Sequence, residues 1–296
     1  MSYDHIIDKR QVRSAFERAA AGYDQAAVLQ REVCDRMLSR LEYIKYVPSV
    51  ILDAGSGTGY GTRKLLMRYP AAHMLAIDIA PTMHRQARPV VSRWRQLLGV
   101  GGNRDRNQTS YIAGDIEQMP LTDSSAGLVF SNLTLQWCND IKKTFTEVHR
   151  ILQTGGLFMF STFGPDTLKE LRQAFRSVDD YSHVNRFTDM HDIGDMLVHS
   201  GFATPVMDME YITLTYNDVI GVMRDLKAIG AHNVTQGRRR GLTGKATWQK
   251  AIGQYETLRR EGKLPATFEV VYGHAWKPQP RTSVLTPETR RQLGLE

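Results

Sequence analysis

The chain has 296 residues, of which 42% are hydrophobic, 23% charged and 9% aromatic. This composition is typical of a globular protein with a sizeable core, and it excludes disordered, collagen-like and low-complexity chains. Its 38 Lys and Arg residues exceed its 31 Asp and Glu residues, and the net charge of +7 indicates an acidic partner: a nucleic acid, an anionic membrane or an acidic protein.

The N-terminal segment is predicted to be helical. Its first 13 residues are too polar for a secretion signal. Residues 8–45 then carry apolar side chains at helical intervals, with an interruption at Gly22. Because these helices precede the first predicted strand, we expect them to form a cap that can lie over a site.

Short apolar strands alternate with amphipathic helices from residue 50 onward. Strands are predicted at Val50–Ala54, Met74–Ile77, Tyr111–Ala113, Leu128–Ser131 and Leu157–Ser161, with helices that begin near Thr58, Pro81, Asp140 and Pro165. This alternation is typical of a doubly wound α/β domain with a mostly parallel, Rossmann-like sheet. The apolar stretch 156–163 has less than half of the roughly 20 residues that a membrane span needs, so it is predicted to be a buried strand.

The remaining residues are predicted to complete a seven-stranded sheet. The expected elements are a helix at Asp189–His199, a strand at Val206–Thr215, helices at Asn217–Ile229 and Thr243–Arg260, and a last strand at Thr267–Trp276. We expect a single domain over residues 1–296. Its parts are the cap at 8–45, a core at 46–163, and a C-terminal half at 164–296 with a helical insert at about 217–263.

A glycine-rich turn follows the first predicted strand, within residues 50–61. Its glycines let a ligand approach the backbone at the carboxyl end of the strand, where doubly wound sheets bind ligands. As a dinucleotide motif it is imperfect, because Tyr60 occupies the third glycine position and the carboxylate of Asp53 repels phosphate. That carboxylate instead favours an ammonium or sulfonium group.

Two further acidic residues end the next two predicted strands. Asp78 can accept hydrogen bonds from both hydroxyls of a ribose, and Asp115 can accept one from an adenine amino group. With Asp53, they indicate a ligand that is adenosyl and cationic rather than phosphorylated. No His or Cys residues have metal-ligand spacing, and Cys34 and Cys138 are too few for a disulfide scaffold, so we expect no metal and a reduced, cytoplasmic protein.

These motifs resemble those of the class I S-adenosylmethionine-dependent methyltransferases, over about residues 45–163. Residues 53–59 are similar to the first motif of that class, residues 114–116 to its adenine motif, and residues 132–137 to the segment that borders the methyl group. The resemblance implies S-adenosylmethionine as the cofactor. The cofactor-binding residues that it implies are Tyr23, Asp53, Gly55, Gly57, Gly59, Asp78, Ile79, Asp115, Ile116 and Asn132.

Three segments, at residues 132–140, 163–172 and 187–194, resemble the malonyl-[acyl-carrier-protein] O-methyltransferase family of biotin synthesis. This resemblance implies methylation of the free carboxylate of a malonyl thioester on acyl carrier protein or coenzyme A. We expect a monomer that binds neither nucleic acid nor membrane.

Alternatives to this function stay open at the level of the sequence. The same segments resemble an adenosyl-ligand-binding hydroxylase that assists assembly of respiratory complex I, and another small-molecule methyltransferase is also compatible with the motifs. A nucleic-acid methyltransferase is disfavoured, because the segment after the fourth strand lacks the Asn or Asp, Pro, Pro, aromatic motif of amino-nitrogen enzymes.

The malonyl carboxyl group has a pKa of about 4 and is ionised at neutral pH, so its methylation needs no general base. The protein must hold the carboxylate in line with the methyl group and exclude water. We predict that Arg172 steers the carboxylate while Tyr23 and Trp137 wall the methyl group. The alternative for Arg172 is a solvated ion pair with Glu170 or Asp166, and the alternative for the aromatic residues is core packing.

Positive charge is concentrated in the predicted helical insert. Residues 219–263 carry ten basic and three acidic side chains, so their net charge of +7 equals that of the whole chain. An insert before the last strand forms a substrate cover in this family. The charge therefore predicts that Arg238, Arg239 and Arg240 dock an acidic carrier protein, with a solvated helical surface as the alternative.

Overall fold

The computed structural model describes residues 6–88, 108–176, 178, 181, 183–230 and 244–279. Its centre is a seven-stranded sheet with the strand order β3-β2-β1-β4-β5-β7-β6. The strands are β1 (Val50–Ala54), β2 (His73–Asp78), β3 (Thr109–Ala113), β4 (Ala126–Ser131), β5 (Leu152–Phe163), β6 (Ala203–Tyr216) and β7 (Leu264–Trp276). Strands β1 to β5 are parallel, whereas β7 is antiparallel to both β5 and β6. The predicted α/β class with a mostly parallel sheet is confirmed.

The order of strand addition reverses at β1. Strands β2 and β3 extend the sheet on one side of β1, and β4 and β5 extend it on the other. Asp53 of β1 is paired with Ala76 of β2 and with Phe130 of β4. The carboxyl ends of the strands that flank such a reversal are the usual ligand site of an open α/β sheet.

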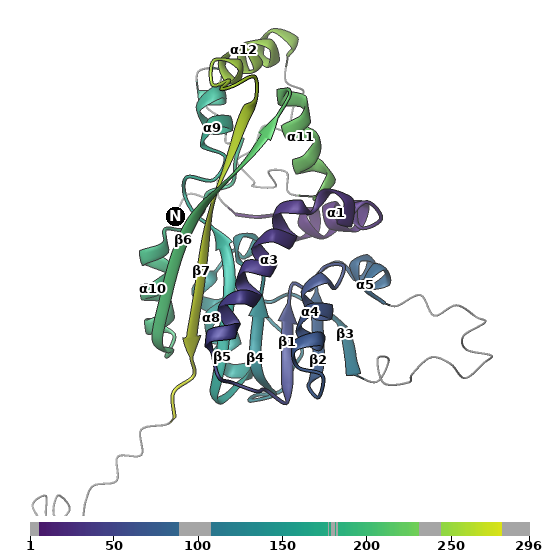
Figure 1. The fold of residues 1–296 in the computed structure, drawn as a ribbon, viewed down its shortest axis with the longest axis vertical. Coiled ribbons are helices and arrows are strands. Elements are labelled where there is room, and N and C mark those ends of the chain that lie inside the picture. Colours follow the sequence, from purple (N-terminus) through teal and green to yellow (C-terminus); the bar gives the residue numbers. More distant parts are fainter. Residues whose placement is uncertain are drawn as a thin grey trace, which may run out of the picture.

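Helices cover both faces of the sheet (Figure 1). They include α3 (Val28–Arg40) and α4 (Tyr60–Arg68) on one face, and α8 (Ile141–Ile151) and α10 (Met190–His199) on the other. Met37 of α3 and Leu65 of α4 share a buried cluster with Leu128, while Phe145 of α8 packs in a second cluster with Val129. Adjacent strand residues thus face opposite sides, as the alternation of a β-strand requires.

The remaining helices lie near the ends of the sheet. They are α1 (Lys9–Ala19), α2 (Tyr23–Ala26), η2 (Leu41–Tyr43), α5 (Pro81–Ala87), η3 (Leu135–Trp137), α9 (Lys169–Arg176), α11 (Val219–Ala228) and α12 (Lys245–Glu256). Strands β6 and β7 are longer than their parallel neighbours and extend beyond them, and α9, α11 and α12 gather around this extension (Figure 1). No helix in the described ranges is long and apolar enough to cross a membrane.

Local capping sets several of the predicted helix starts. The side chain of Asp140 accepts from the Lys143 N–H at the start of α8, and that of Asp189 accepts from the His191 N–H at the start of α10. Each bond satisfies a backbone donor that has no partner within its helix.

Two predicted helix starts differ from the structure, by two and by four residues. Helix α4 begins at Tyr60 rather than near Thr58, because the glycine-rich turn continues to Gly59. Helix α9 begins at Lys169 rather than near Pro165. The chain before α9 is held by β7 instead, since the Leu168 N–H donates to the Thr267 carbonyl oxygen at 2.6 Å.

Candidate functional site

The first cavity lies at the carboxyl ends of β1 to β4, under the N-terminal helices. The predicted residues that line it are Tyr23, Asp53, Gly55, Gly57, Asp78, Ile79, Asp115, Ile116, Asn132 and Trp137. Residues more than 100 positions apart in the chain therefore meet in one space, because parallel strands end at the same edge of the sheet.

The glycine-rich turn forms the floor of this cavity. Gly55 has φ +83°, and a Cβ atom there would lie 2.0 Å from the Thr134 hydroxyl oxygen. Gly57 has φ +52°, with nothing within 4 Å of the position of a Cβ atom. Gly55 is thus required by close packing, whereas Gly57 leaves the backbone open toward the cavity.

Gly59, also predicted to bind the cofactor, does not line the first cavity. A Cβ atom on Gly59 would lie 2.9 Å from the Cβ of Ala87, at the end of α5. Its position, with φ +79°, allows the turn to pack against that helix.

Asp53 is buried beneath the turn. Its carboxylate accepts a hydrogen bond of 2.6 Å from the Thr62 hydroxyl. Burial raises the pKa of Asp53 to about 6, and the nearby Asp78 carboxylate adds to this rise, while the Thr62 bond opposes it. A cation in the cavity would stabilise the ionised form.

Asp78 connects the end of β2 to the glycine-rich turn. One carboxylate oxygen accepts from the Gly57 N–H at 2.9 Å, and the other accepts from the Ala80 N–H at 2.8 Å. Burial raises the pKa of Asp78 to about 6, although both hydrogen bonds favour the ionised form. Each carboxylate oxygen retains a lone pair for a further donor.

Asp115 is paired with a residue of the N-terminal cap. The Lys9 ammonium lies 3.0 Å from one Asp115 oxygen and also pairs with Glu117. Lys9 lines the cavity, but no motif singles it out in the sequence, where it is one of several charged residues at the start of the cap.

Three aromatic side chains, Phe16, Tyr23 and Trp137, also line the first cavity. The ring of Phe16 packs edge to face on Trp137, with centroids 5.3 Å apart, and lies 6.5 Å from that of Tyr23. Burial raises the pKa of Tyr23, and the Asp78 and Asp24 carboxylates add to this rise, so the phenol stays protonated. Phe16 was expected only as an apolar residue of the cap, since the sequence does not show which rings meet.

Asn132 ties β4 to the cap. Its amide nitrogen donates to the Gln30 carbonyl oxygen at 2.9 Å, and its amide oxygen accepts from the Ser161 hydroxyl at 2.9 Å. The next residue, Leu133, has φ +49°. These contacts fix the segment that leads into η3 and Trp137.

A second cavity also uses Trp137 as a wall. Its apolar lining residues are Phe163, Leu168, Leu171, Val184, Phe187, Met223, Leu226, Ile229 and Phe268, and its polar ones are Gln136, Thr167, His183, Asn185 and Lys227. These residues come from η3, β5, α9 and the turn before it, the segment 183–187, the C-terminal half of α11 with the residue after it, and β7. No sequence motif predicted this cavity.

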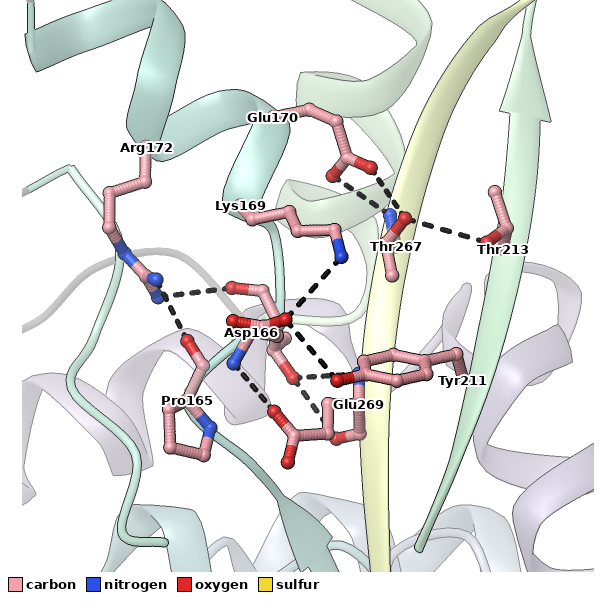
Figure 2. Close-up of polar contacts among 10 residues, drawn as sticks. Pro165, Asp166, Lys169, Glu170, Arg172, Tyr211, Thr213, Thr267 and Glu269 are labelled. Atoms are coloured by element: carbon pink, nitrogen blue, oxygen red, sulfur yellow. Dashed lines mark hydrogen bonds and ion pairs between the residues drawn. The ribbon is translucent and has the colours of Figure 1, made fainter.

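Arg172 lines neither cavity, so the geometry does not support its predicted contact with an acceptor carboxylate. Figure 2 shows its guanidinium directed at backbone oxygens: it donates to the carbonyls of Pro165 at 2.8 Å and Thr167 at 3.1 Å. The alternative ion pairs with Glu170 or Asp166 are not formed either. Arg172 instead stabilises the turn before α9 through these two hydrogen bonds.

Glu170 is likewise turned away from Arg172 in Figure 2, because its carboxylate accepts from the N–H and hydroxyl of Thr267 on β7. The predicted docking residues Arg238, Arg239 and Arg240 lie outside the described residues.

Comparison with known proteins defines the class of this chain. Residues 52–160 match the methyltransferase domain family. The YcgJ protein from Bacillus subtilis has a similar fold, with a TM-score of 0.55 at 16% identity over 82% of this chain and 98% of that one. The chain is therefore a methyltransferase with a Rossmann-like fold, and S-adenosylmethionine is its methyl donor.

Two relatives define the family more closely. The malonyl-[acyl-carrier protein] O-methyltransferase of Nitrosospira multiformis is 78% identical over 300 residues, which cover 100% of this chain and 98% of that protein. The protein of the same name from Gallionella capsiferriformans is 61% identical over 280 residues, or 95% of this chain and 94% of that protein. This chain belongs to the malonyl-[acyl-carrier protein] O-methyltransferase family.

Proposed function

We propose that this protein methylates the free carboxylate of a malonyl thioester carried by acyl carrier protein, giving the methyl ester that enters biotin synthesis. The observation that carries this proposal is the 78% identity, along the whole chain, to a protein named for that activity. The first cavity supports it, because carboxylates at three strand ends suit an adenosyl group joined to a sulfonium.

The residues of the first cavity fit such a cofactor. Asp78 supplies acceptors for the ribose hydroxyls, Asp115 supplies one for the adenine amino group, and Asp53 stabilises positive charge from below the turn. Ile79 and Ile116 line the cavity beside the two acceptor carboxylates and suit the faces of a base. Charge-assisted hydrogen bonds of this kind contribute about 1.5–3 kcal/mol each.

When bound, S-adenosylmethionine supplies an activated methyl group, which a carboxylate oxygen of the acceptor takes as the C–S bond breaks and a C–O bond forms. Tyr23, Phe16 and Trp137 exclude water from this end of the cavity, and Asn132 fixes the segment that carries Trp137. No residue has to remove a proton, because the acceptor carboxyl group is already ionised at neutral pH. Orientation and exclusion of water thus supply the rate enhancement, with up to roughly 7–11 kcal/mol available from ideal orientation.

Purified protein with methyl-labelled S-adenosylmethionine and malonyl-acyl carrier protein tests this proposal. We expect label on the free carboxyl group of the thioester, and none on acetyl-acyl carrier protein, the matched control that lacks this carboxyl group. Malonyl-coenzyme A and free malonate, assayed in parallel, measure the contribution of the carrier. Cofactor binding without any labelled thioester would contradict the proposal and favour an adenosyl-ligand-binding assembly factor.

A further inference from the structure

Asn185 is the unsatisfied polar residue of the second cavity. Its side chain is buried, with the residue only 7% exposed, and its amide oxygen has no hydrogen-bond partner. A buried oxygen without a partner is unfavourable, so a ligand that donates a hydrogen bond is expected to fill this role.

Two other polar side chains of the cavity, Gln136 and Thr167, already have partners. The amide of Gln136 donates to the Leu133 carbonyl oxygen at 2.6 Å and accepts from the Thr162 hydroxyl at 3.3 Å. The hydroxyl of Thr167 donates to the Glu269 carbonyl oxygen at 3.1 Å. Asn185 differs from these two residues because its buried amide oxygen has no hydrogen-bond partner.

Lys227 and Trp137 mark two different sides of the second cavity. Lys227 lies on α11, is exposed to solvent, and forms no ion pair with any residue in the described ranges, so it marks the solvent side. Trp137 is shared with the first cavity and marks the side toward the methyl donor. A negatively charged ligand that enters past Lys227 would thus reach the cofactor cavity along mostly apolar walls.

We propose that the second cavity binds the thioester arm of the acceptor, with Asn185 accepting a hydrogen bond from an amide N–H of the arm and Lys227 attracting its phosphate. This inference rests on the proposed function. The phosphopantetheine arm of a carrier protein combines methylene groups, amide N–H donors and a phosphodiester, which suit the apolar walls, the buried oxygen and the exposed cation respectively. Free malonate has no N–H donor, so Asn185 would favour the thioester over the free acid.

Binding of malonyl-pantetheine to the protein saturated with S-adenosylhomocysteine, measured by calorimetry, tests the role of Asn185. We expect Asn185→Leu to weaken binding about five- to tenfold, because a neutral hydrogen bond is lost. Leucine has the same branched shape and the same number of side-chain heavy atoms as asparagine, and the substitution removes the unsatisfied oxygen, so the melting temperature should not fall. Ser200→Ala is the matched control, since the Ser200 hydroxyl is also buried without a partner but lines neither cavity.

Two further variants separate the parts of the proposal. Met223→Trp fills the cavity and should abolish malonyl-pantetheine binding while sparing S-adenosylhomocysteine. Lys227→Ala should weaken malonyl-coenzyme A binding about two- to threefold at low salt, but leave malonyl-pantetheine, which lacks phosphate, unchanged.

Failure of this inference is distinct from failure of the proposed function. Absent binding of malonyl-pantetheine to the wild type, or unchanged binding in both Asn185→Leu and Met223→Trp, would overturn the acceptor site even if label transfer to malonyl-acyl carrier protein succeeds. Conversely, Asn185-dependent binding without label transfer would uphold the site and reject the reaction.

Discussion

The two cavities that meet at Trp137 are built in different ways. The first is lined by glycine backbone and by carboxylates at or just after the carboxyl ends of three successive strands. The second is lined mainly by apolar side chains from elements between residues 136 and 268 that have no common motif. The first cavity is thus determined by sheet topology, and the second by the packing of elements around the extended ends of β6 and β7.

Gly55→Ala should have the largest effect, because it breaks the floor of the first cavity. The new Cβ atom would lie 2.0 Å from the Thr134 hydroxyl oxygen, and the residue would have φ +83°. The backbone conformation alone costs about 1–2 kcal/mol, and the clash must displace the segment that leads to Trp137. We expect a lower melting temperature and no measurable cofactor binding by calorimetry.

Gly57→Ala is the matched control for this prediction. It also has positive φ, +52°, but a Cβ atom there meets nothing within 4 Å. In the ligand-free protein its loss of stability should be clearly smaller than that of Gly55→Ala. Equal losses would mean that backbone conformation, and not contact with Thr134, makes glycine necessary at position 55.

Asp78→Ala should have the next largest effect and sharpen the contrast between the cavities. Loss of a charge-assisted acceptor worth about 1.5–3 kcal/mol should weaken S-adenosylmethionine binding at least tenfold. Malonyl-pantetheine binding should change much less, because Asp78 does not line the second cavity. An intact circular dichroism spectrum with unchanged cofactor affinity would refute the role of Asp78.

The same contrast explains what the sequence could predict. Asp53, Asp78 and Asp115 were placed correctly in one cavity, because hydrophobic periodicity locates strand ends and parallel strands bring those ends together. Arg172 was not, because the direction of a long side chain depends on which oxygens its neighbours leave free. The carbonyls of Pro165 and Thr167 lie within reach of Arg172 in a segment that also bonds to β7, through the Leu168 N–H.

Asn185 is a residue of a candidate site that the sequence did not predict. Nothing in its local sequence distinguishes it from a surface asparagine. Its importance follows from its burial and from the cavity that it lines together with residues of α11 and β7, which are distant in the chain. Sites made by such packing can be found only once the tertiary structure is known.

A pH effect on cofactor binding also concerns the first cavity, and for each carboxylate it should be smaller than the effect of Asp78→Ala. Burial raises the pKa values of Asp53 and Asp78 to about 6 from 3.8. At pH 5.5 only about a quarter of such a group is ionised. Protonation of each carboxylate should therefore weaken cofactor binding about fourfold relative to pH 7.5. Calorimetry at pH 6 should also show proton release on binding, because a cationic ligand favours the ionised forms.

The stability of the ligand-free protein should respond to these two groups in the opposite direction. Their pKa values are higher in the folded chain than in the unfolded chain, so the folded state binds more protons between about pH 4 and 6. Their contribution to the unfolding free energy is therefore fully present below about pH 4 and is lost as pH rises through 6.

Asp78→Asn removes one group, so its cofactor binding should be less pH-dependent than that of the wild type. An equally steep dependence in Asp78→Asn would assign the titration to Asp53 alone and remove Asp78 from this linkage.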